Sequence, residues 1–272
     1  MTLAADARAW IESHVAVTGE AERVHVRPWS TVWRIPTADG VVWFKAPEPE
    51  FAYEAAVLEV LLPLAPDVLP EVIASSPEAG WLLLADAGER AREHPADWPL
   101  LLRRYAELQL AAVPHADALL AAGAIDHRDL ADRVRRLTPF LAGETAAQLE
   151  ARLPEVDERL ARLRDSPLPV TIDHNDLHDG NVFTRAGHAR ILDWGDSTVG
   201  HPFLSLIKMP SSGRDAYLEV FTALVPAEQL RADAADVLAL RPLLQALTED
   251  RVARADPSFD GIEELVLSFL RG

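Results

Sequence analysis

The chain has 272 residues, 49% of them hydrophobic and 25% charged, which suits a globular protein made of one large domain or two packed lobes. Its formal net charge of −17 argues against a nucleic-acid partner, and no apolar run is long enough to span a membrane. The absence of cysteine excludes disulfides and thiolate metal sites, and the N-terminus has no secretory-signal pattern, so we expect a cytoplasmic protein.

The first part of the chain is predicted to form a small antiparallel sheet with two helices. Apolar spacing predicts helices at 4–17 and 50–61 and strands at 24–27, 31–35, 41–45, 68–74 and 81–85. The Asp39-Gly40 pair lies between two apolar, β-prone runs, which is typical of a hairpin turn. Prolines between residues 63 and 70 are expected to end the second helix.

From Trp98 onward the pattern is mainly helical. Leucine and alanine recur at helical spacing, which indicates core packing rather than a binding stripe. The predicted helices span 99–113, 116–122, 130–141, 146–164, 216–224, 227–240, 242–253 and 261–270. We therefore expect a helical second part, interrupted by a polar block between residues 170 and 195.

That block contains a polar loop between two short β-prone runs, His174-Asn-Asp-Leu-His-Asp-Gly-Asn181, in which Asp176 and Asn181 are five residues apart. A third apolar run ends at Asp193, which is followed by Trp and Gly. A carboxylate can orient a hydroxyl and accept its proton, and amide and carboxylate oxygens suit Mg²⁺. The two segments resemble the catalytic loop and metal-holding segment of the kinase fold, in the variant typical of the aminoglycoside phosphotransferase and choline kinase family.

This resemblance implies a two-lobed, protein-kinase-like α+β fold, with a nucleotide-binding lobe at 1–87 built on a small antiparallel sheet and a mainly helical lobe at 88–272. It implies ATP and Mg²⁺ as cofactors and an active site between the lobes. The reaction would move the γ-phosphate to a hydroxyl of a small molecule, such as an aminoglycoside, amino sugar, sugar or amino alcohol. Asp176 would orient and deprotonate that hydroxyl, while Asn181 and Asp193 would hold the metal. The acceptor, the choice between ATP and GTP and the oligomeric state stay open.

The resemblance also implies how the nucleotide phosphates are held. Lys45 ends the third strand and would reach the α- and β-phosphates, braced by a helix glutamate. Glu54 is the better candidate for that glutamate because it lies well inside the predicted helix, and Glu50 is the second choice. The first hairpin lacks G-x-G-x-x-G, because Pro28-Trp-Ser30 stands where glycines would let backbone amides approach phosphate. We therefore expect Ser30 or Thr31 to offer a hydroxyl or an amide instead.

The segment after the fifth predicted strand, Asp86-Ala-Gly88, resembles the hinge between the lobes in this family. There the backbone would hold the edge of the adenine ring, around Leu84, Ala85 and Ala87. An ordinary transition from strand to loop would give the same sequence. The prediction therefore depends on the position of the segment and not on its side chains.

The polar loop has other interpretations besides the kinase-like one. His174 and His178 are four apart, as in a zinc hydrolase, but Asn175 stands where that motif needs a glutamate. A polar turn without chemistry would leave the second segment at Asp193 unexplained. A catalytically silent nucleotide- or partner-binding module of the same fold is the main alternative. In the kinase-like interpretation His174 braces the loop and does not react.

The segment after Asp193 departs from the family, which often has an Asp-Pro pair there and another acid a few residues later. This chain has His201-Pro202 and then Ser205. If the usual acids help to hold the loop or the acceptor, this protein must hold the loop or the acceptor with other residues. Glu249 and Asp250 are candidates for contact with a cationic acceptor, although two acids on a helix are usually just solvated.

Overall fold

The computed structural model describes residues 3–255 and 259–272, and its contacts divide the chain into two compact units. Unit 1 comprises Met1–Ala96 and Asp179–Gly195, and unit 2 comprises Asp97–His178 and Asp196–Gly272. This division differs from the single boundary predicted between residues 87 and 88. The chain returns to unit 1 because the strand that follows the polar loop pairs with a strand from the first 96 residues.

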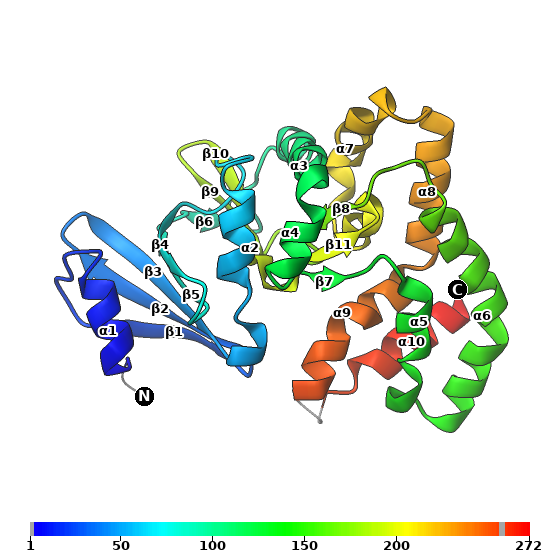
Figure 1. The fold of residues 1–272 in the computed structure, drawn as a ribbon, viewed down its shortest axis with the longest axis horizontal. Helices are drawn as coiled ribbons and strands as arrows, with labels where there is room; N and C mark the ends of the chain where they lie inside the picture. The colour runs from blue at the N-terminus through cyan, green and yellow to red at the C-terminus, as the bar shows by residue number, and fades with distance from the viewer. Residues whose placement is uncertain (1–2, 256–258) are drawn as a thin grey trace. The chain divides into compact units, whose positions relative to one another are not determined.

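Unit 1 is built on a five-stranded antiparallel sheet with the strand order β1-β2-β3-β5-β4 (Figure 1). Its elements are α1 (Ala5–Glu12), β1 (Glu22–Arg27), β2 (Ser30–Thr37), β3 (Gly40–Pro47), the 3₁₀ helix η1 (Pro49–Phe51), α2 (Glu54–Leu61), β4 (Val72–Ser76) and β5 (Trp81–Ala85). The predicted hairpin forms at Asp39-Gly40, where Gly40 takes a φ of 126° that favours glycine.

One face of this sheet is covered by α1. Ile11 of α1 packs with Trp33, Ile35 and Phe44 in a buried apolar cluster. Successive side chains of a strand point to opposite faces. Phe44 therefore fills the core under α1, while the next residue, Lys45, projects from the other face of the sheet.

A short ribbon completes unit 1. Strands β9 (Val182–Arg185) and β10 (His188–Ile191) form an antiparallel hairpin, and β9 also pairs with β6 (Glu89–Arg90). Both residues of the connecting turn, Ala186 and Gly187, have positive φ values of 50° and 82°. Such a turn matches the right-handed twist of the two strands.

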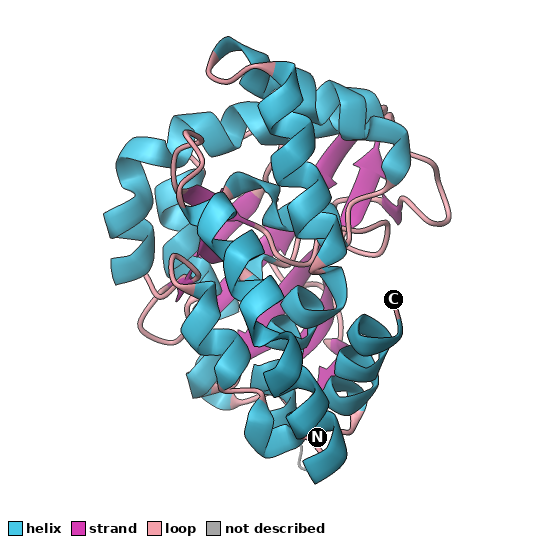
Figure 2. Cartoon of the chain, turned by 90° about the vertical axis from the view of Figure 1, so that its right-hand side faces the viewer, coloured by secondary structure: helices cyan, strands magenta, loops and turns pink. Residues whose placement is uncertain are grey.

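Unit 2 is mainly helical, and helices predominate over strands in the chain as a whole (Figure 2). Its helices are α3 (Trp98–Ala112), α4 (Ala116–Ala121), α5 (Leu130–Arg135), α6 (Gly143–Arg164), α7 (Arg214–Val220), α8 (Ala227–Ala239), α9 (Arg241–Ala255) and α10 (Gly261–Arg271), joined by the short 3₁₀ helices η2 (Val113–His115), η3 (Thr138–Phe140), η5 (Pro202–Ile207), η6 (Ser211–Gly213) and η7 (Phe221–Ala223). A three-stranded sheet with the order β7-β11-β8 lies among them, made of β7 (Ile125–Asp126), β11 (Thr198–Gly200) and β8 (Thr171–Asp173). The 3₁₀ helix η4 (Trp194–Asp196) begins in unit 1 and ends in unit 2.

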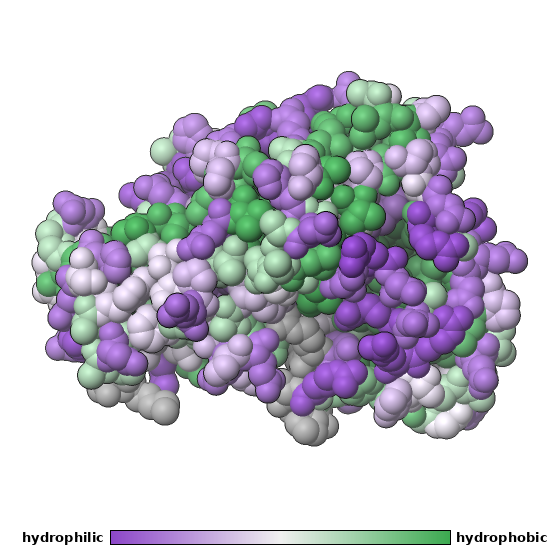
Figure 3. All heavy atoms as spheres, in the orientation of Figure 1, coloured by the Kyte–Doolittle hydropathy of each residue, from purple (hydrophilic) through white to green (hydrophobic). Residues whose placement is uncertain are grey.

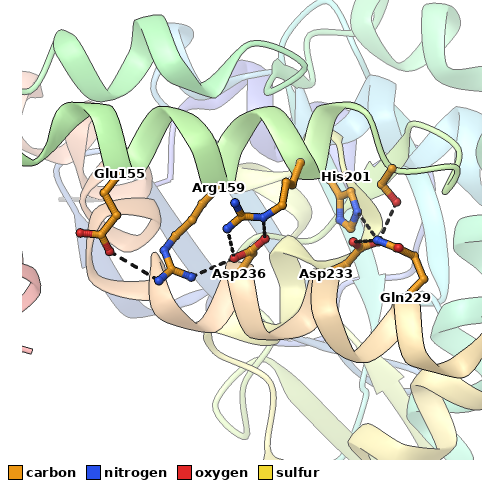
Figure 4. Close-up of polar contacts among 8 residues, drawn as sticks. Glu155, Arg159, His201, Gln229, Asp233 and Asp236 are labelled. Atoms are coloured by element: carbon orange, nitrogen blue, oxygen red, sulfur yellow. Dashed lines mark hydrogen bonds and ion pairs between the residues drawn. The ribbon is translucent and has the colours of Figure 1, made fainter.

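Polar contacts fix α6 to α8 in unit 2 (Figure 4). Arg159 and Arg162 of α6 both donate to the buried carboxylate of Asp236 on α8, at 2.8 Å and 2.7 Å. One turn earlier on α8, Asp233 accepts a hydrogen bond from Ser166 and lies 3.7 Å from Nε2 of His201. The segment that contains His201 is thereby held against α8.

The surface agrees with the acidic, mixed composition of the sequence. Hydrophilic residues cover much of the face seen in Figure 3, with apolar residues mixed among them. Among the described residues, none of the helices combines the length and the apolar character that crossing a membrane requires.

Candidate active site

Lys45 is held by two carboxylates within unit 1. It lies on β3, and its Nζ is 2.5 Å from Oε2 of Glu54, the first residue of α2. Glu54 is buried, so the structure joins Lys45 to the first-choice glutamate of the sequence analysis and not to Glu50. Nζ is also 2.5 Å from Oδ1 of Asp193. The predicted phosphate-binding lysine and one predicted metal ligand are therefore neighbours.

The two carboxylates stabilise the charge of Lys45, although they repel each other. Burial alone would lower the pKa of Lys45, but the attraction of Asp193 and Glu54 outweighs it and raises that pKa above its ordinary value. Burial raises the pKa of Glu54, against the opposing effect of the Lys45 ammonium group. Lys45 therefore stays a cation, and such a cation can bind phosphate oxygens.

Glu54 also fixes the backbone that follows Asp193. Its Oε1 accepts a hydrogen bond of 3.0 Å from the amide of Trp194, and the hydroxyl of the neighbouring Tyr53 donates to the carbonyl oxygen of Gly195. Asp193 has a φ of 64°, in the left-handed region that few non-glycine residues occupy. Backbone held in that conformation needs support from its surroundings, and α2 supplies it.

Asn181 lies at the same end of the β9–β10 ribbon as Asp193. The amide of Leu192, the residue before Asp193, donates to the carbonyl oxygen of Asn181 at 2.8 Å. Arg190 fixes the second strand by donating to the carbonyl oxygens of Pro66 and Leu69, each at 2.7 Å. The backbone of the ribbon thus brings Asn181 close to the residue before Asp193, and an amide with a carboxylate is a donor set that fits a hard cation such as Mg²⁺.

Ser30 is buried at the start of β2, where it pairs with Pro47 of β3 and Arg27 of β1. It thus lies in the first hairpin, as the sequence indicated. The hairpin is tied to the end of β3, because the amide of Glu48 donates to the carbonyl oxygen of Trp29 at 2.8 Å. Its role toward phosphate stays a prediction.

The predicted hinge is partly occupied by hydrogen bonds within unit 1. The amide of Ala85 donates to the carbonyl oxygen of Glu71 at 2.9 Å, and Leu84 pairs with Trp43 and Val72 inside the sheet. A contact between the Ala85 amide and a nucleotide base would have to replace that bond.

The next residues of the hinge are held by the β9 strand. The carbonyl oxygen of Asp86 accepts a hydrogen bond of 2.6 Å from Arg185. A Cβ atom on Gly88 would lie 2.2 Å from the carbonyl oxygen of Thr184, so the close approach requires glycine. Ala87 lies between these two residues inside unit 1, and both its place in a hinge and its contact with the base stay predictions.

Asp176 lies in unit 2, on the loop that follows β8. Its Oδ1 is 2.6 Å from Nζ of Lys208, and its Oδ2 is 3.5 Å from Nε2 of His178. Burial would raise the pKa of Asp176, but the hydrogen bond from His178 and the charge of Lys208 hold it well below its ordinary value. The predicted hydroxyl-orienting group is therefore ionised at neutral pH. Lys208 was missed by the sequence analysis, because 32 residues separate it from Asp176.

His174 is fully buried and braces this loop, in agreement with the structural role expected for it. Its amide donates to the hydroxyl of Tyr105 on α3 at 2.9 Å, and its Nδ1 accepts a hydrogen bond of 3.3 Å from the amide of Asp176. Asn175 between them has a φ of 64°. The imidazole thus holds the loop through the backbone of Asp176.

A buried acid that the sequence analysis did not single out replaces the acid expected near residue 205. Asp173, at the end of β8, accepts hydrogen bonds from the Ser205 hydroxyl at 2.6 Å and from the Asn175 amide at 2.5 Å. Burial raises the pKa of Asp173 to about 7. In place of the usual aspartate, His201 caps η5 by accepting from the amide of Phe203 at 3.2 Å. The buried carboxylate is therefore that of Asp173 on β8, and the hydroxyl that donates to it is that of Ser205 on η5.

Comparison with known proteins agrees with this geometry. The model of a phosphotransferase enzyme family matches residues 23–243, which is most of the chain. Among curated proteins, no sequence shows a significant match.

Solved structures with the same fold are distant in sequence. A macrolide 2'-phosphotransferase type I is 15% identical, with a TM-score of 0.66 over 99% of this chain and 98% of that one. An aminoglycoside 2'-phosphotransferase-IIIa variant in complex with GDP is 14% identical, with a TM-score of 0.63 and coverage of 95% and 92%. A choline/ethanolamine kinase family protein from Mesorhizobium loti is 16% identical, with a TM-score of 0.57 and coverage of 94% and 87%. The chain has a kinase-like α+β fold. It belongs to the phosphotransferase enzyme family, which supports a small-molecule phosphotransferase.

Proposed function

We propose that this protein transfers the γ-phosphate of ATP, bound as its magnesium complex, to a hydroxyl group of a small molecule. The observation that carries the proposal is the cluster in unit 1, where Lys45 is held between Glu54 and Asp193. A structural ion pair needs one acid, whereas this lysine has two, and one of them has a side chain that is 53% exposed. The cluster carries one net negative charge, so a metal ion bound at the partly exposed Asp193 would balance that charge and would let the Lys45 ammonium group donate to the phosphate oxygens.

Each residue of unit 1 has a separate task in this proposal. Lys45 binds the α- and β-phosphates, and Glu54 keeps its ammonium group in place. Asn181 and Asp193 hold Mg²⁺, which when bound neutralises charge on the phosphate oxygens. The hinge around Leu84, Ala85 and Ala87 holds the base, and Ser30 lies in the hairpin assigned to the phosphates. Most of the catalysis then comes from positioning and charge neutralisation.

In unit 2, Asp176 orients the acceptor. Its carboxylate accepts a hydrogen bond from the acceptor hydroxyl, whose oxygen forms a bond to the γ-phosphorus as the bond from phosphorus to the β,γ-bridging oxygen breaks. ADP leaves with the electrons of that bond, and the hydroxyl proton passes to Asp176 or to solvent. Because the pKa of Asp176 is low, we infer that it acts mainly as a hydrogen-bond acceptor and only late as a base.

Proteins of the same fold support the substrate class. Structures of the aminoglycoside phosphotransferase APH(4)-Ia have been solved as ternary complexes with hygromycin B and either ADP or AMP-PNP. Others act, by name, on macrolides, choline or ethanolamine. We therefore place the acceptor among hydroxylated antibiotics, amino sugars, sugars and amino alcohols, with ATP as the expected donor and GTP as the one to compare.

A screen of hydroxyl acceptors, with ADP release and product mass as the two readouts, tests the proposal. We expect wild-type protein to phosphorylate at least one acceptor class, and Asp176→Asn to keep magnesium-ATP binding while losing about 10²-fold or more of the transfer rate. Asp215→Asn changes an exposed acid of α7 and is the matched control. Unchanged turnover in Asp176→Asn would remove that residue from its role. Nucleotide binding with no acceptor in any class would favour the alternative, a catalytically silent binding module.

A further inference from the structure

Lysine is almost absent from this chain. The sequence contains 26 lysine and arginine residues, and only Lys45 and Lys208 are lysine. The ion pairs of the helical surfaces use arginine, as in the contacts of Arg159 and Arg162 with Asp236. Both lysines contact acids of the proposed active site, Lys45 at Asp193 and Lys208 at Asp176. The second lysine therefore needs an explanation of its own.

Lys208 lies between carboxylates from two different elements of unit 2. It follows η5, and its Nζ is 2.6 Å from Oδ1 of Asp176 on the loop after β8 and 3.8 Å from Oε1 of Glu249 on α9. Its side chain is only 17% exposed, and that of Asp176 is 19% exposed. An ion pair so shielded from solvent is stronger and better ordered than one on the surface.

The backbone beneath Lys208 is held firmly. Its amide donates to the carbonyl oxygen of Ser205 at 3.3 Å, and the amide of the buried Met209 donates to the same oxygen at 3.1 Å. The hydroxyl of Ser205 is in turn bonded to Asp173, three residues before Asp176. The ammonium group and the carboxylate are thus positioned by one connected set of contacts.

We propose that Lys208 is a positioning residue for phosphoryl transfer, which holds the Asp176 carboxylate by its Oδ1 atom and leaves Oδ2 to meet the acceptor hydroxyl. This inference rests on the role proposed for Asp176 above. His178, which lies 3.5 Å from Oδ2, would give way to the acceptor or share that oxygen with it. Among its described contacts, the charged and titratable groups that face Asp176 are His178 from its own loop, Lys208 from the end of η5 and Glu249 from α9.

The choice of lysine over arginine follows from the way each cation engages a carboxylate. An ammonium group is a compact point charge with three donors, whereas a guanidinium group is a planar fork that prefers to engage both oxygens of a carboxylate. An arginine at this position would tend to occupy both oxygens of Asp176, and the oxygen needed by the acceptor would be taken. The charge alone is therefore insufficient, and the size of the cation matters.

Two substitutions separate charge from size. Lys208→Met removes the charge with a side chain of similar length, so the pKa of Asp176 should rise. The acidic limb of the pH profile of kcat/KM should then move to higher pH, because Asp176 becomes protonated there, and kcat should fall about 10²-fold. Lys208→Arg keeps the charge, so its acidic limb should stay near that of the wild type while kcat falls.

Magnesium-ATP affinity is the internal control, since Lys208 does not belong to the proposed nucleotide site, and Asp215→Asn is the matched surface variant. The inference is overturned if Lys208→Met keeps the wild-type acidic limb, or if Met and Arg give the same profile and the same loss. The latter result would indicate packing alone.

A readout that needs no acceptor keeps the inference separate from the proposed function. With ¹³C-labelled lysine side chains, the protein should give two ε-carbon signals, assigned with Lys208→Arg. Asp176→Asn should shift the Lys208 signal and leave the Lys45 signal in place. A Lys208 signal that does not move would show that the ion pair is absent in solution and overturn the inference, whether or not an acceptor is found. Failure to find any acceptor, with the signal shifted, would count against the proposed function only.

Discussion

Replacing Asp173 by asparagine should change how the stability of this protein depends on pH. The carboxyl group is fully buried, with the Ser205 hydroxyl and the backbone amides of Asn175 and Ser205 as its donors and no cation beside it among its described contacts. Burial raises its pKa from an ordinary value of 3.8 to about 7. Asparagine keeps the acceptor oxygen at this position and removes the ionisation.

The sign and size of the effect follow from linkage. Between about pH 4 and pH 7 the folded state binds a proton at Asp173 that the unfolded state does not, so the contribution of this site to the free energy of unfolding falls as pH rises through this window. A shift of about three pKa units corresponds to ~4 kcal/mol, which is an upper limit for this one site. Relative to the wild type, Asp173→Asn should therefore gain stability from pH 4 to pH 8.

Urea unfolding followed by tryptophan fluorescence, at intervals from pH 4 to pH 8, measures this difference. The comparison between variant and wild type cancels other groups that titrate in the same window. Asp215→Asn, which removes an exposed carboxyl group, should run parallel to the wild type. If the Asp173→Asn curve also runs parallel to the wild type, the carboxyl group is not buried without a cation, and the reasoning about the loop after β8 is refuted.

Three further predictions test the packing inside unit 1 and inside unit 2. Gly88→Ala should lower the melting temperature, since φ is 89° and the new Cβ would meet the carbonyl oxygen of Thr184. In the control Gly40→Ala the new Cβ meets no atom, so the free energy of unfolding should fall only by the ~1 kcal/mol that the positive φ costs. Asp236→Asn should destabilise the protein by about 1–3 kcal/mol in urea unfolding, because two arginines of α6 lose their shared partner. Burial lowers the pKa of His127 to about 3, so the contribution of His127 to stability should fall as pH drops from 6.5 toward 3. His127→Phe should therefore gain stability relative to the wild type over that window in thermal melts. Equal melting temperatures for Gly88→Ala and Gly40→Ala would contradict the close contact at Gly88. An unchanged urea midpoint for Asp236→Asn would contradict the shared ion pair. A His127→Phe curve that runs parallel to the wild type at acid pH would contradict the burial of His127.

Much of unit 1 could be predicted because its signals are local. The apolar run before Lys45 placed this residue on the third strand, near the end of β3, and helix spacing selected Glu54 over Glu50, although Glu54 is the first residue of α2. The pairing of these two residues follows from the positions of neighbouring elements. The predicted helix at 50–61 was too long, because Pro49 begins a separate 3₁₀ turn and α2 starts only at Glu54.

Several features of unit 2 could not be predicted from local sequence patterns. The helix predicted at 130–141 ends at Arg135, and Pro139 lies in a 3₁₀ turn instead. Short strands such as β7 are too brief for a periodic pattern. The contacts of Asp173 with Ser205 and of Asp176 with Lys208 each join residues 32 apart, and only the folded chain shows them. The rarity of lysine was the one signal in the sequence that pointed to Lys208.

Calorimetric titration of ATP into wild-type protein and Asp193→Ala, each with and without Mg²⁺, tests the central claim most directly. The claim is that Lys45, Asn181 and Asp193 form a site for a metal-chelated triphosphate. We expect wild-type protein to bind ATP more tightly with Mg²⁺ than without it, and Asp193→Ala to lose that increment. Equal magnesium dependence in the two proteins would contradict the metal assignment, and no binding of ATP by the wild type would contradict the proposed function itself.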